Sequence, residues 1–211
     1  MSCILFGSKS TKDDYGFIVA PYLIPMPAVQ SNYVEIPGRD GRLDLSEGFG
    51  RVRYSDRAIS INLYALAPYD AAVSRFVNDV HGKRLQLVFD KDPDFYYVGR
   101  ISVDGLEKRD GYCVATVNAA AEPYKYKRTV TTVSGTGGGD VSLINLNMPV
   151  VPQITATASA NLSYISGGAA VYSSIAAGIH IIPSLILEAG LNTVGIVTEG
   201  TVSFQYREGA L

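Results

Sequence analysis

Charged residues are divided very unevenly along this chain of 211 residues. Of its 18 Lys and Arg and 20 Asp and Glu residues, only five lie beyond residue 130: Asp140, Glu188, Glu199, Arg207 and Glu208. The length permits one large or two small domains with hydrophobic cores. We therefore expect two domains, residues 1–130 and 131–211. The Gly-rich run 134–140 marks the junction, because such a run is typical of a linker or an exposed loop.

The bulk composition indicates a globular protein that stays in the compartment where it is made. Hydrophobic residues make up 47% of the chain and charged residues 18%, as in soluble domains with a core. The formal net charge of −2 argues against a dedicated nucleic-acid binder. The chain has no basic start and no run near the roughly 18 apolar residues of a membrane span, so we expect neither a signal peptide nor membrane insertion. Its two cysteines fit a reducing cytosol.

The first domain is predicted to be a β-meander with one helix laid across it, an α+β arrangement. Its apolar and polar residues alternate with the period of two that is typical of strands. The expected strands cover 15–23, 33–36, 51–54, 58–64, 84–89, 95–103 and 112–117. The side chains in them that we expect to face the core include Ile59, Ile61, Leu63 and Cys113.

One segment, 69–81, has helical periodicity instead. Its apolar residues recur at i, i+3, i+4 and i+7, which gives one buried stripe. They are Val73, Phe76, Val77 and Val80. Pro68 and Asp70 suit the first turn of this helix, and Gly82 suits its C-terminal cap.

The second domain consists of short alternating segments between Gly and Asn turns, which predict a small β-sandwich or jelly roll. The expected strands cover 153–158, 162–165, 170–174, 178–182, 185–187, 193–197 and 202–206. His180 alternates with Ile179 and Ile181, so we expect it to point outward. A domain with so few charges is poorly soluble alone, and we infer that part of its surface is covered in an assembly.

A dense cluster of turn formers and charges, residues 34–47, lies between two apolar segments of the first domain. Pro37 sets φ for the first corner position, while Gly38 and Gly41 accept the positive φ that other residues resist. Local chemistry therefore predicts a hairpin turn. It does not explain why Arg and Asp alternate so regularly beside the turn.

No pattern in the chain predicts a catalytic residue, a metal site or a cofactor. The acidic run 90–94 opens like a calcium loop but lacks the Gly and the Glu required at the sixth and twelfth positions. The glycines of 135–139 precede no Lys-Ser or Lys-Thr pair, as a phosphate-binding loop requires. His81 and His180 have no acidic or cysteine neighbours at ligand spacing. A hydrolase with paired carboxylates stays open, because its two acids need only meet in space.

Taken together, several ordered segments resemble the distal tail protein of siphophages, the bacteriophages with long, non-contractile tails. In the first domain they are IPGRDG (36–41), LDLS (43–46), RAI (57–59), HGK (81–83), DPDFYYVGR (92–100) and EPYKY (122–126). In the second domain they are LEAGLNT (187–193) and VSFQYR (202–207). Their order and spacing match the family as well as their residues do.

The resemblance implies a mostly β (α+β) fold: an N-terminal tail-tube-like β-sandwich with one flanking helix, and a small C-terminal galectin-like β-sandwich. It implies a homohexameric ring at the distal end of the virion tail, made and assembled in the cytoplasm of the bacterial host. The implied partners are the tail tube protein, the tail-associated lysin or tail tip protein and, in some phages, a receptor-binding protein. DNA only passes through the ring, and no enzyme activity or cofactor is implied.

A closed ring needs two different complementary patches on each subunit. Alternating charges penalise misaligned neighbours more than they add affinity, so the charged turn is the candidate for the subunit interface, against the alternative that its residues only solvate a corner. The candidate interface residues are Pro37, Gly38, Arg39, Asp40, Gly41, Arg42, Asp44 and Glu47.

The alternative function is a carbohydrate-binding or adhesion module for host-surface glycans. Sugar sites favour aromatic platforms, and the chain contains no Trp. Tyr164, Tyr172 and Tyr206 remain available in the second domain. From the sequence we therefore expect this domain to be structural and not to bind a glycan with useful affinity.

Overall fold

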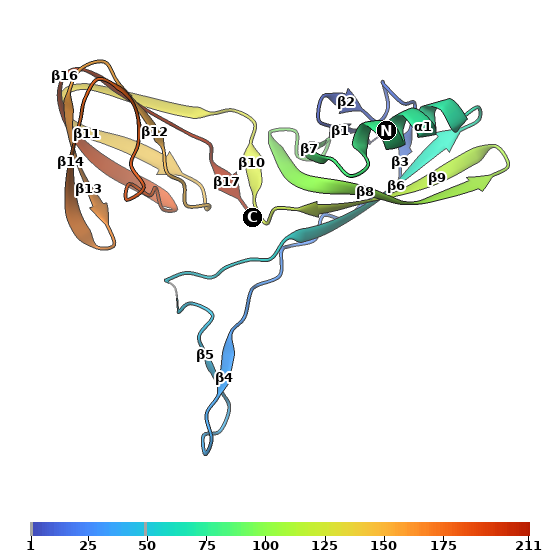
Figure 1. The fold of residues 1–211 in the computed structure, drawn as a ribbon, viewed down its shortest axis with the longest axis horizontal. Coiled ribbons are helices and arrows are strands. Elements are labelled where there is room, and N and C mark those ends of the chain that lie inside the picture. Colours follow the sequence, from blue (N-terminus) through green and yellow to red (C-terminus); the bar gives the residue numbers. More distant parts are fainter. Residues whose placement is uncertain (1, 49) are drawn as a thin grey trace. The chain divides into compact units, whose positions relative to one another are not determined.

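The structure is a computed structural model that describes residues 2–48 and 50–211. It divides into two compact units, Met1–Pro123 and Tyr124–Leu211, which Figure 1 shows in blue to green and in yellow to red. The division falls before Tyr124, earlier than the junction expected at 130/131. In the part of the chain described, no helix is long and apolar enough to cross a membrane.

A curved antiparallel sheet and one helix form most of the first unit. The strand order in the sheet is β2-β1-β7-β8-β9-β6-β3. The elements are β1 (Ile4–Phe6), β2 (Lys9–Ser10), β3 (Ile18–Val19), β6 (Arg57–Leu66), α1 (Asp70–Val80), β7 (Arg84–Phe89), β8 (Phe95–Arg109) and β9 (Tyr112–Ala121). Strands β4 (Tyr33–Glu35) and β5 (Arg42–Asp44) form a small sheet of their own.

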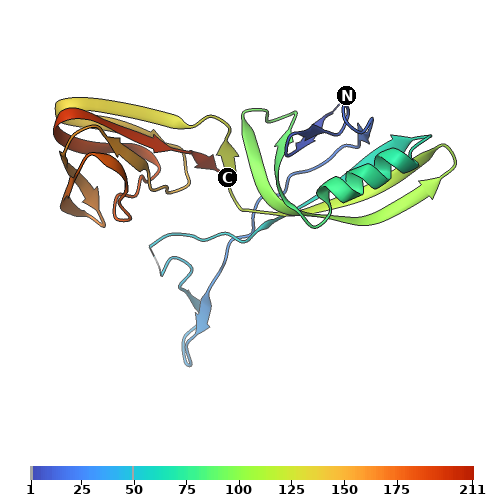
Figure 2. The same ribbon diagram turned by 45° about the horizontal axis from the view of Figure 1, so that its top comes forward.

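Helix α1 lies along one face of the curved sheet (Figure 2). Its apolar stripe is confirmed, because Val73, Phe76 and Val80 are all buried. The ring of Phe76 meets Phe6 edge-on at 5.5 Å between centroids and Phe17 at 5.2 Å. The two ends of the sheet thus curl toward the helix around one aromatic cluster, which places the core between helix and sheet.

Strand β6 confirms the predicted alternation, since Ile59, Ile61 and Leu63 are buried and the residues between them are exposed. Two predicted strands are wrong. Of 15–23 only the short β3 forms. Gly16 takes a φ of +69° before it, and Pro21 after it has no backbone N–H to donate to a sheet. The segment 51–54 makes only isolated pairing, because its partner is the irregular chain around Val29 and not the main sheet.

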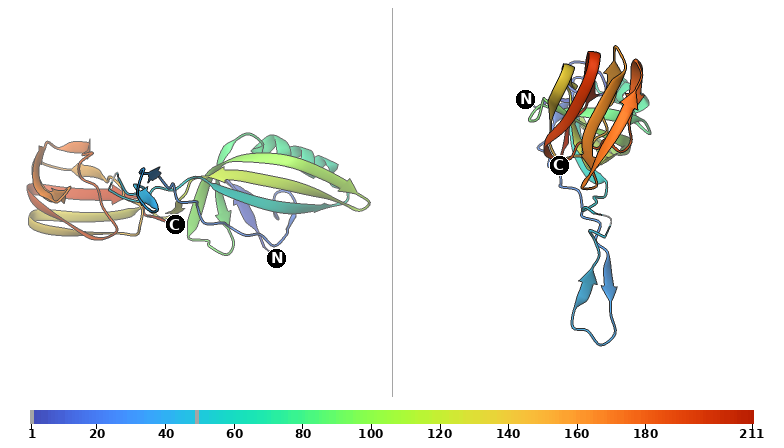
Figure 3. Two further views of the ribbon diagram at one scale, coloured as in Figure 1. Left: turned by 90° about the horizontal axis from the view of Figure 1, so that it is seen from below. Right: turned by 90° about the vertical axis from the view of Figure 1, so that its left-hand side faces the viewer.

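Two long strands, β11 (Thr131–Asn145) and β16 (Gly190–Tyr206), organise the second unit. They pair along their whole length, with a register shift between Thr136 and Gly138. On one side of this shift β16 also pairs with β13, and on the other side it pairs with β12. The sheet therefore folds over itself into a β-sandwich (Figure 3), as the sequence predicted.

The remaining strands of this unit extend the two halves of the sandwich. They are β10 (Lys125–Lys127), β12 (Gln153–Ala156), β13 (Ala160–Ser166), β14 (Ala169–Ile175), β15 (Gly178–Ile181) and β17 (Gly209–Ala210). Leu162 and Ile196 from one half and Ile154 and Phe204 from the other are buried in a common core. The order β14-β13-β16-β12-β15 leaves β14 and β15 at the edges.

The prediction that the Gly-rich run 134–140 is a linker or an exposed loop is wrong, because this run forms the middle of β11. Gly137, with a φ of +71°, sits at the register shift and supplies a conformation that other residues resist. A Cβ on Gly135 would lie 2.5 Å from Val141 and 2.6 Å from Ile196. These glycines therefore allow β11 to bend and to pack closely against the side chains of Val141 and Ile196. Pairing with β16 supplies the hydrogen bonds of the β11 backbone.

The orientation expected for β15 is wrong. His180 pairs in register with the buried Ile154 and shares its inner face, where its ring lies 2.9 Å from the carbonyl oxygen of Ala176. Ile179 and Ile181 instead point outward, each 67% exposed. The predicted strand 185–187 is also wrong, because only a single bridge joins this segment to Val150.

Candidate functional site

The candidate interface residues lie on an extended excursion of the first unit, residues 23–48 and 50–56, which we call the arm (Figure 1). Near its root the two legs are joined by hydrogen bonds from Gln30 N to the Arg53 carbonyl oxygen, 2.9 Å, and from Ser55 N to the Ala28 carbonyl oxygen, 2.8 Å. Farther out, β4 and β5 pair with Glu35 opposite Arg42. The arm is therefore a thin, two-legged ribbon without a core of its own.

The tip of the arm is the predicted hairpin turn. Arg39 N donates a hydrogen bond to the Ile36 carbonyl oxygen at 3.1 Å, which closes a turn with Pro37 and Gly38 at its corners. Gly38 has a φ of +80° and Gly41 a φ of +76°, so both use the conformation predicted for them. The turn holds the neighbouring charges at the end of the ribbon.

A small hydrogen-bond network closes the base of the β4–β5 hairpin. Leu45 N donates to the Asn32 carbonyl oxygen at 2.7 Å, and Asn32 N donates to Ser46 Oγ at 2.9 Å. Ser46 N in turn donates to Asp44 Oδ1 at 2.9 Å. The hydroxyl and the N–H of Ser46 together hold the pKa of the Asp44 carboxyl below its usual value. Asp44 thus has a local structural role in the hairpin, besides being a candidate interface residue.

The other charged candidates face solvent. Arg39, Asp40, Arg42 and Glu47 are exposed, and within residues 2–48 and 50–211 none of them forms an ion pair. The Arg42 guanidinium lies over the Tyr33 ring, 5.0 Å from its centroid. The structure thus brings the candidates together on one hairpin but leaves their charges available to another surface.

Apolar side chains are also exposed along the whole arm. Their exposed fractions are Leu23 79%, Met26 75%, Val29 52%, Tyr33 48%, Val34 41%, Ile36 40% and Leu45 40%. A two-stranded ribbon is marginally stable alone in water, and many exposed apolar side chains on one segment indicate an interaction site. Sequence reasoning missed Leu23, Met26 and Val29; three prolines interrupting an apolar segment were the signal that could have found them.

Arg57 joins the root of the arm to the far end of the first unit. Its side chain is 2% exposed. Nε donates to the Pro123 carbonyl oxygen at 2.7 Å, and Nη1 donates to the Pro25 carbonyl oxygen at 3.0 Å. The guanidinium also lies over the Tyr97 ring at 5.4 Å. Arg57 therefore fixes where the arm leaves the sheet, a role that its place in a strand pattern did not indicate.

Other candidate chemistry has ordinary structural explanations. His81 caps the C-terminus of α1, and its Nδ1 accepts a hydrogen bond from Val103 N at 3.0 Å. The acidic run 90–94 is the turn between β7 and β8. Cys113 is buried as predicted, and both cysteines are free. Among the residues that the structure describes, no group of three or more His, Cys, Asp and Glu is placed to hold a metal ion.

Comparison with models of protein families and with curated protein sequences gives no match. Among solved structures, the chain is similar to the Dit (gp 19.1) protein of phage SPP1, described as a paradigm of the hub adsorption apparatus in phages that infect Gram-positive hosts. The TM-score is 0.72 at 15% identity, and the match covers 100% of both chains. The chain has the fold of a siphophage distal tail protein. The mostly β fold class that the sequence resemblance implied is thereby confirmed.

Proposed function

We propose that this chain is a non-enzymatic structural protein of a phage tail, and that six copies form a ring at the distal end of that tail. In this proposal the ring is a hub that joins the tail tube to the tail-associated lysin or tail tip protein and, where present, to a receptor-binding protein. The full-length match in fold to a hub protein supports the general role. The observation that carries the ring is the exposed apolar arm.

The arm is proposed to pack on the neighbouring subunit. Burial of apolar surface is the dominant favourable term in most protein–protein association, and Met26 and Val29 are two of the most exposed apolar side chains of the arm. Docking on a neighbour would give the ribbon the core that it lacks. In this proposal each arm docks on a surface of the neighbour other than that neighbour's own arm, and a contact between two different patches is heterologous and can close into a ring.

The charges at the tip are proposed to set the register of that contact. Arg39 and Asp40 are adjacent, opposite in sign and exposed. A neighbour that presents the complementary order attracts both, whereas a shifted neighbour repels at least one of them. Pro37, Gly38 and Gly41 contribute by holding the turn, so their role in the interface is indirect.

The part of the first sheet formed by β6 and β9, on the face opposite α1, is proposed to line the opening through which DNA passes. No outward residue of β6 or β9 is charged. The middle of this face carries small polar side chains, including Ser60, Asn62, Thr116 and Asn118. Lys and Arg bind DNA phosphates strongly. Arg84 and Arg100 lie on this face but on the neighbouring strands β7 and β8, so the outward side of β6 and β9 offers DNA a surface on which it is not retained.

A charge reversal at the arm tip tests the ring proposal. In the double variant Arg39→Asp, Asp40→Arg the fold should be unchanged, because both side chains are exposed and unpaired among the described residues. The population of hexamers should fall, which native mass spectrometry of the full chain over a concentration series measures. Replacing Met26 and Val29 together with Ser should also weaken the hexamer, because it removes apolar surface from the arm.

The chain contains a control at a second Arg-Asp-Gly turn, where Arg109, unlike Arg39, forms an ion pair with Glu107 in the described part of the chain. Arg109 and Asp110 precede Gly111 between β8 and β9, and the double variant Arg109→Asp, Asp110→Arg makes the same exchange of charges away from the arm. This control should assemble like the unaltered chain. An arm-tip variant with the same hexamer population as the control would contradict the assignment of Arg39 and Asp40 to the interface.

A further inference from the structure

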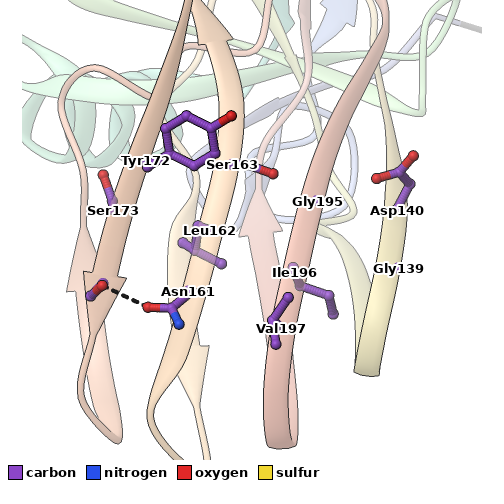
Figure 4. Close-up of a pocket in the computed structure, with 11 residues that line it drawn as sticks. Gly139, Asp140, Asn161, Leu162, Ser163, Tyr172, Ser173, Gly195, Ile196 and Val197 are labelled. Atoms are coloured by element: carbon purple, nitrogen blue, oxygen red, sulfur yellow. Dashed lines mark hydrogen bonds between the residues drawn. The ribbon is translucent and has the colours of Figure 1, made fainter.

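A groove of about 490 Å³ crosses the outward face of the β-sandwich in the second unit (Figure 4). It lies over strands β14, β13, β16 and β11. Tyr172 pairs with Ser163, Ser163 with Gly195, and Gly195 with Asp140, so these four residues form one row across the four strands. Three strand spacings of about 4.8 Å separate the ends of the row, roughly 14 Å in all. This span suits a short oligosaccharide lying across the strands.

A glycine makes the floor of the groove. A Cβ on Gly195 would lie 2.4 Å from Ser163 Oγ and 3.3 Å from Asp140 Oδ1. Any larger residue would therefore fill the space between the two polar side chains. Because Gly195 has no side chain, a ligand can reach both of them from above the sheet.

The walls of the groove offer an aromatic face and several hydrogen-bonding groups. Tyr172 is 80% exposed. Asn161 Oδ1 accepts a hydrogen bond from Ser174 Oγ at 2.6 Å, which orients the amide and leaves its NH₂ group as a donor (Figure 4). The Asp140 carboxylate and the Ser163 hydroxyl make no hydrogen bond within residues 2–48 and 50–211. A planar amide, a carboxylate and a hydroxyl beside an exposed ring can bind alternating C–H faces and hydroxyl groups.

The charge of the groove indicates the class of ligand. Asp140 is the one charged residue among those that line it, and no Lys, Arg or His is among them. A phosphorylated or otherwise anionic ligand would meet a carboxylate without a compensating cation. A neutral ligand with many hydroxyl groups instead meets acceptors and donors of both kinds.

We propose that this groove binds a neutral saccharide chain. One ring of the chain stacks on Tyr172, the next hydroxyl groups bond to Asn161 and Ser163 above Gly195, and a further hydroxyl donates to Asp140. The proposal replaces the sequence-based expectation that the second domain binds no glycan: Tyr164 and Tyr206 are buried, at 4% and 3% exposed, but Tyr172 supplies the platform. It does not depend on the proposed ring, because the whole row lies within one subunit.

Titration of the full chain by NMR tests this proposal. The neutral probes are maltotriose, cellotriose, mannotriose and tri-N-acetylchitotriose, and glucose 6-phosphate is the anionic probe. At least one neutral probe should give saturable signal changes. Tyr172→Ala should weaken its binding roughly tenfold, as loss of a stacking partner does. Gly195→Ala should weaken it as well by filling the floor, and glucose 6-phosphate should not bind.

Tyr64→Ala is the matched control, because Tyr64 is another exposed tyrosine but lies on the first unit, at 36% exposed. This variant should bind like the unaltered chain. The proposal is overturned if no neutral probe binds saturably, if only glucose 6-phosphate binds, or if Tyr172→Ala and Gly195→Ala, both checked for folding by their amide spectra, bind as tightly as Tyr64→Ala.

Discussion

Replacing Arg57 should destabilise the first unit and make the root of the arm more mobile, although Arg57 is only the first residue of β6. The buried guanidinium donates to the carbonyl oxygens of Pro25 and Pro123, and each hydrogen bond from a charged donor contributes about 1.5–3 kcal/mol. Part of this stabilisation is offset, because burial disfavours the charge and lowers the pKa of Arg57. Its Nη2 also has no hydrogen-bond partner within the described residues. We expect Arg57→Ala to lower the free energy of unfolding of the first unit by about 3 kcal/mol.

Hydrogen exchange during urea unfolding measures this effect, because peptides from each unit report separately and the two units need not unfold together. Peptides that contain Pro25 should exchange faster in Arg57→Ala even without urea. Arg57→Lys should lose about half as much stability, since an ammonium group cannot span both carbonyls. Arg100→Ala is the control: this exposed arginine donates to the Gly82 carbonyl oxygen at 2.6 Å, and its loss should cost less than about 0.5 kcal/mol. Equal stability of the Arg57→Ala and Arg100→Ala proteins would contradict this role of the Arg57 guanidinium.

Two further predictions concern the core and the pH dependence of the first unit. Phe76→Ala should destabilise it by about 3–5 kcal/mol, because the ring is fully buried among other aromatic rings; an unfolding measurement that finds less than about 1 kcal/mol would contradict the central place of this ring. Hydrogen bonds from Lys9 Nζ at 2.6 Å and Tyr15 Oη at 2.8 Å hold the pKa of the Asp79 carboxyl below its usual value. The stabilisation that follows from a lowered carboxyl pKa is present above about pH 4 and is lost as pH falls through the folded-state pKa. Urea midpoints should therefore drop less on acidification in Asp79→Asn than in the unaltered chain; an identical drop would contradict this.

Much of the fold could be predicted where local patterns and tertiary contacts agree. The alternation of β6 and the apolar stripe of α1 each mark one buried face, and both faces are buried as expected. The turn at Pro37 and Gly38 could be predicted for the same reason, since positive φ at a glycine is decided locally.

The failures arise where long-range pairing overrides local preference. Glycine is a poor strand former, yet Gly135 lies in β11 because β16 supplies its pairing partner and leaves no room for a side chain. The prediction assigned the inward and outward residues of β15 the wrong way round, because alternation alone does not say which set of residues meets the core. Arg57 was missed because a charged residue is rarely buried without a charged partner, and its hydrogen bonds join carbonyls far apart in the sequence.

The candidate site could be predicted only in part. The sequence placed the charged residues on one turn, and the structure places that turn at the end of an exposed ribbon. Exposure of Leu23, Met26 and Val29 could not be read from hydrophobicity, which normally indicates burial. Apart from the prolines that interrupt this segment, only the path of the backbone distinguishes apolar residues that build a core from those that stay exposed.

The central claim is that the arm joins copies of this chain into a six-membered ring. Negative-stain electron microscopy of the purified full chain, alone and co-expressed with a tail tube protein, tests it most directly. A six-membered ring held by the arm should give class averages with six-fold symmetry and an open centre, and these rings should be lost in the variant with Arg39 and Asp40 exchanged. Monomers in both preparations, or rings that persist unchanged in the variant, would contradict it.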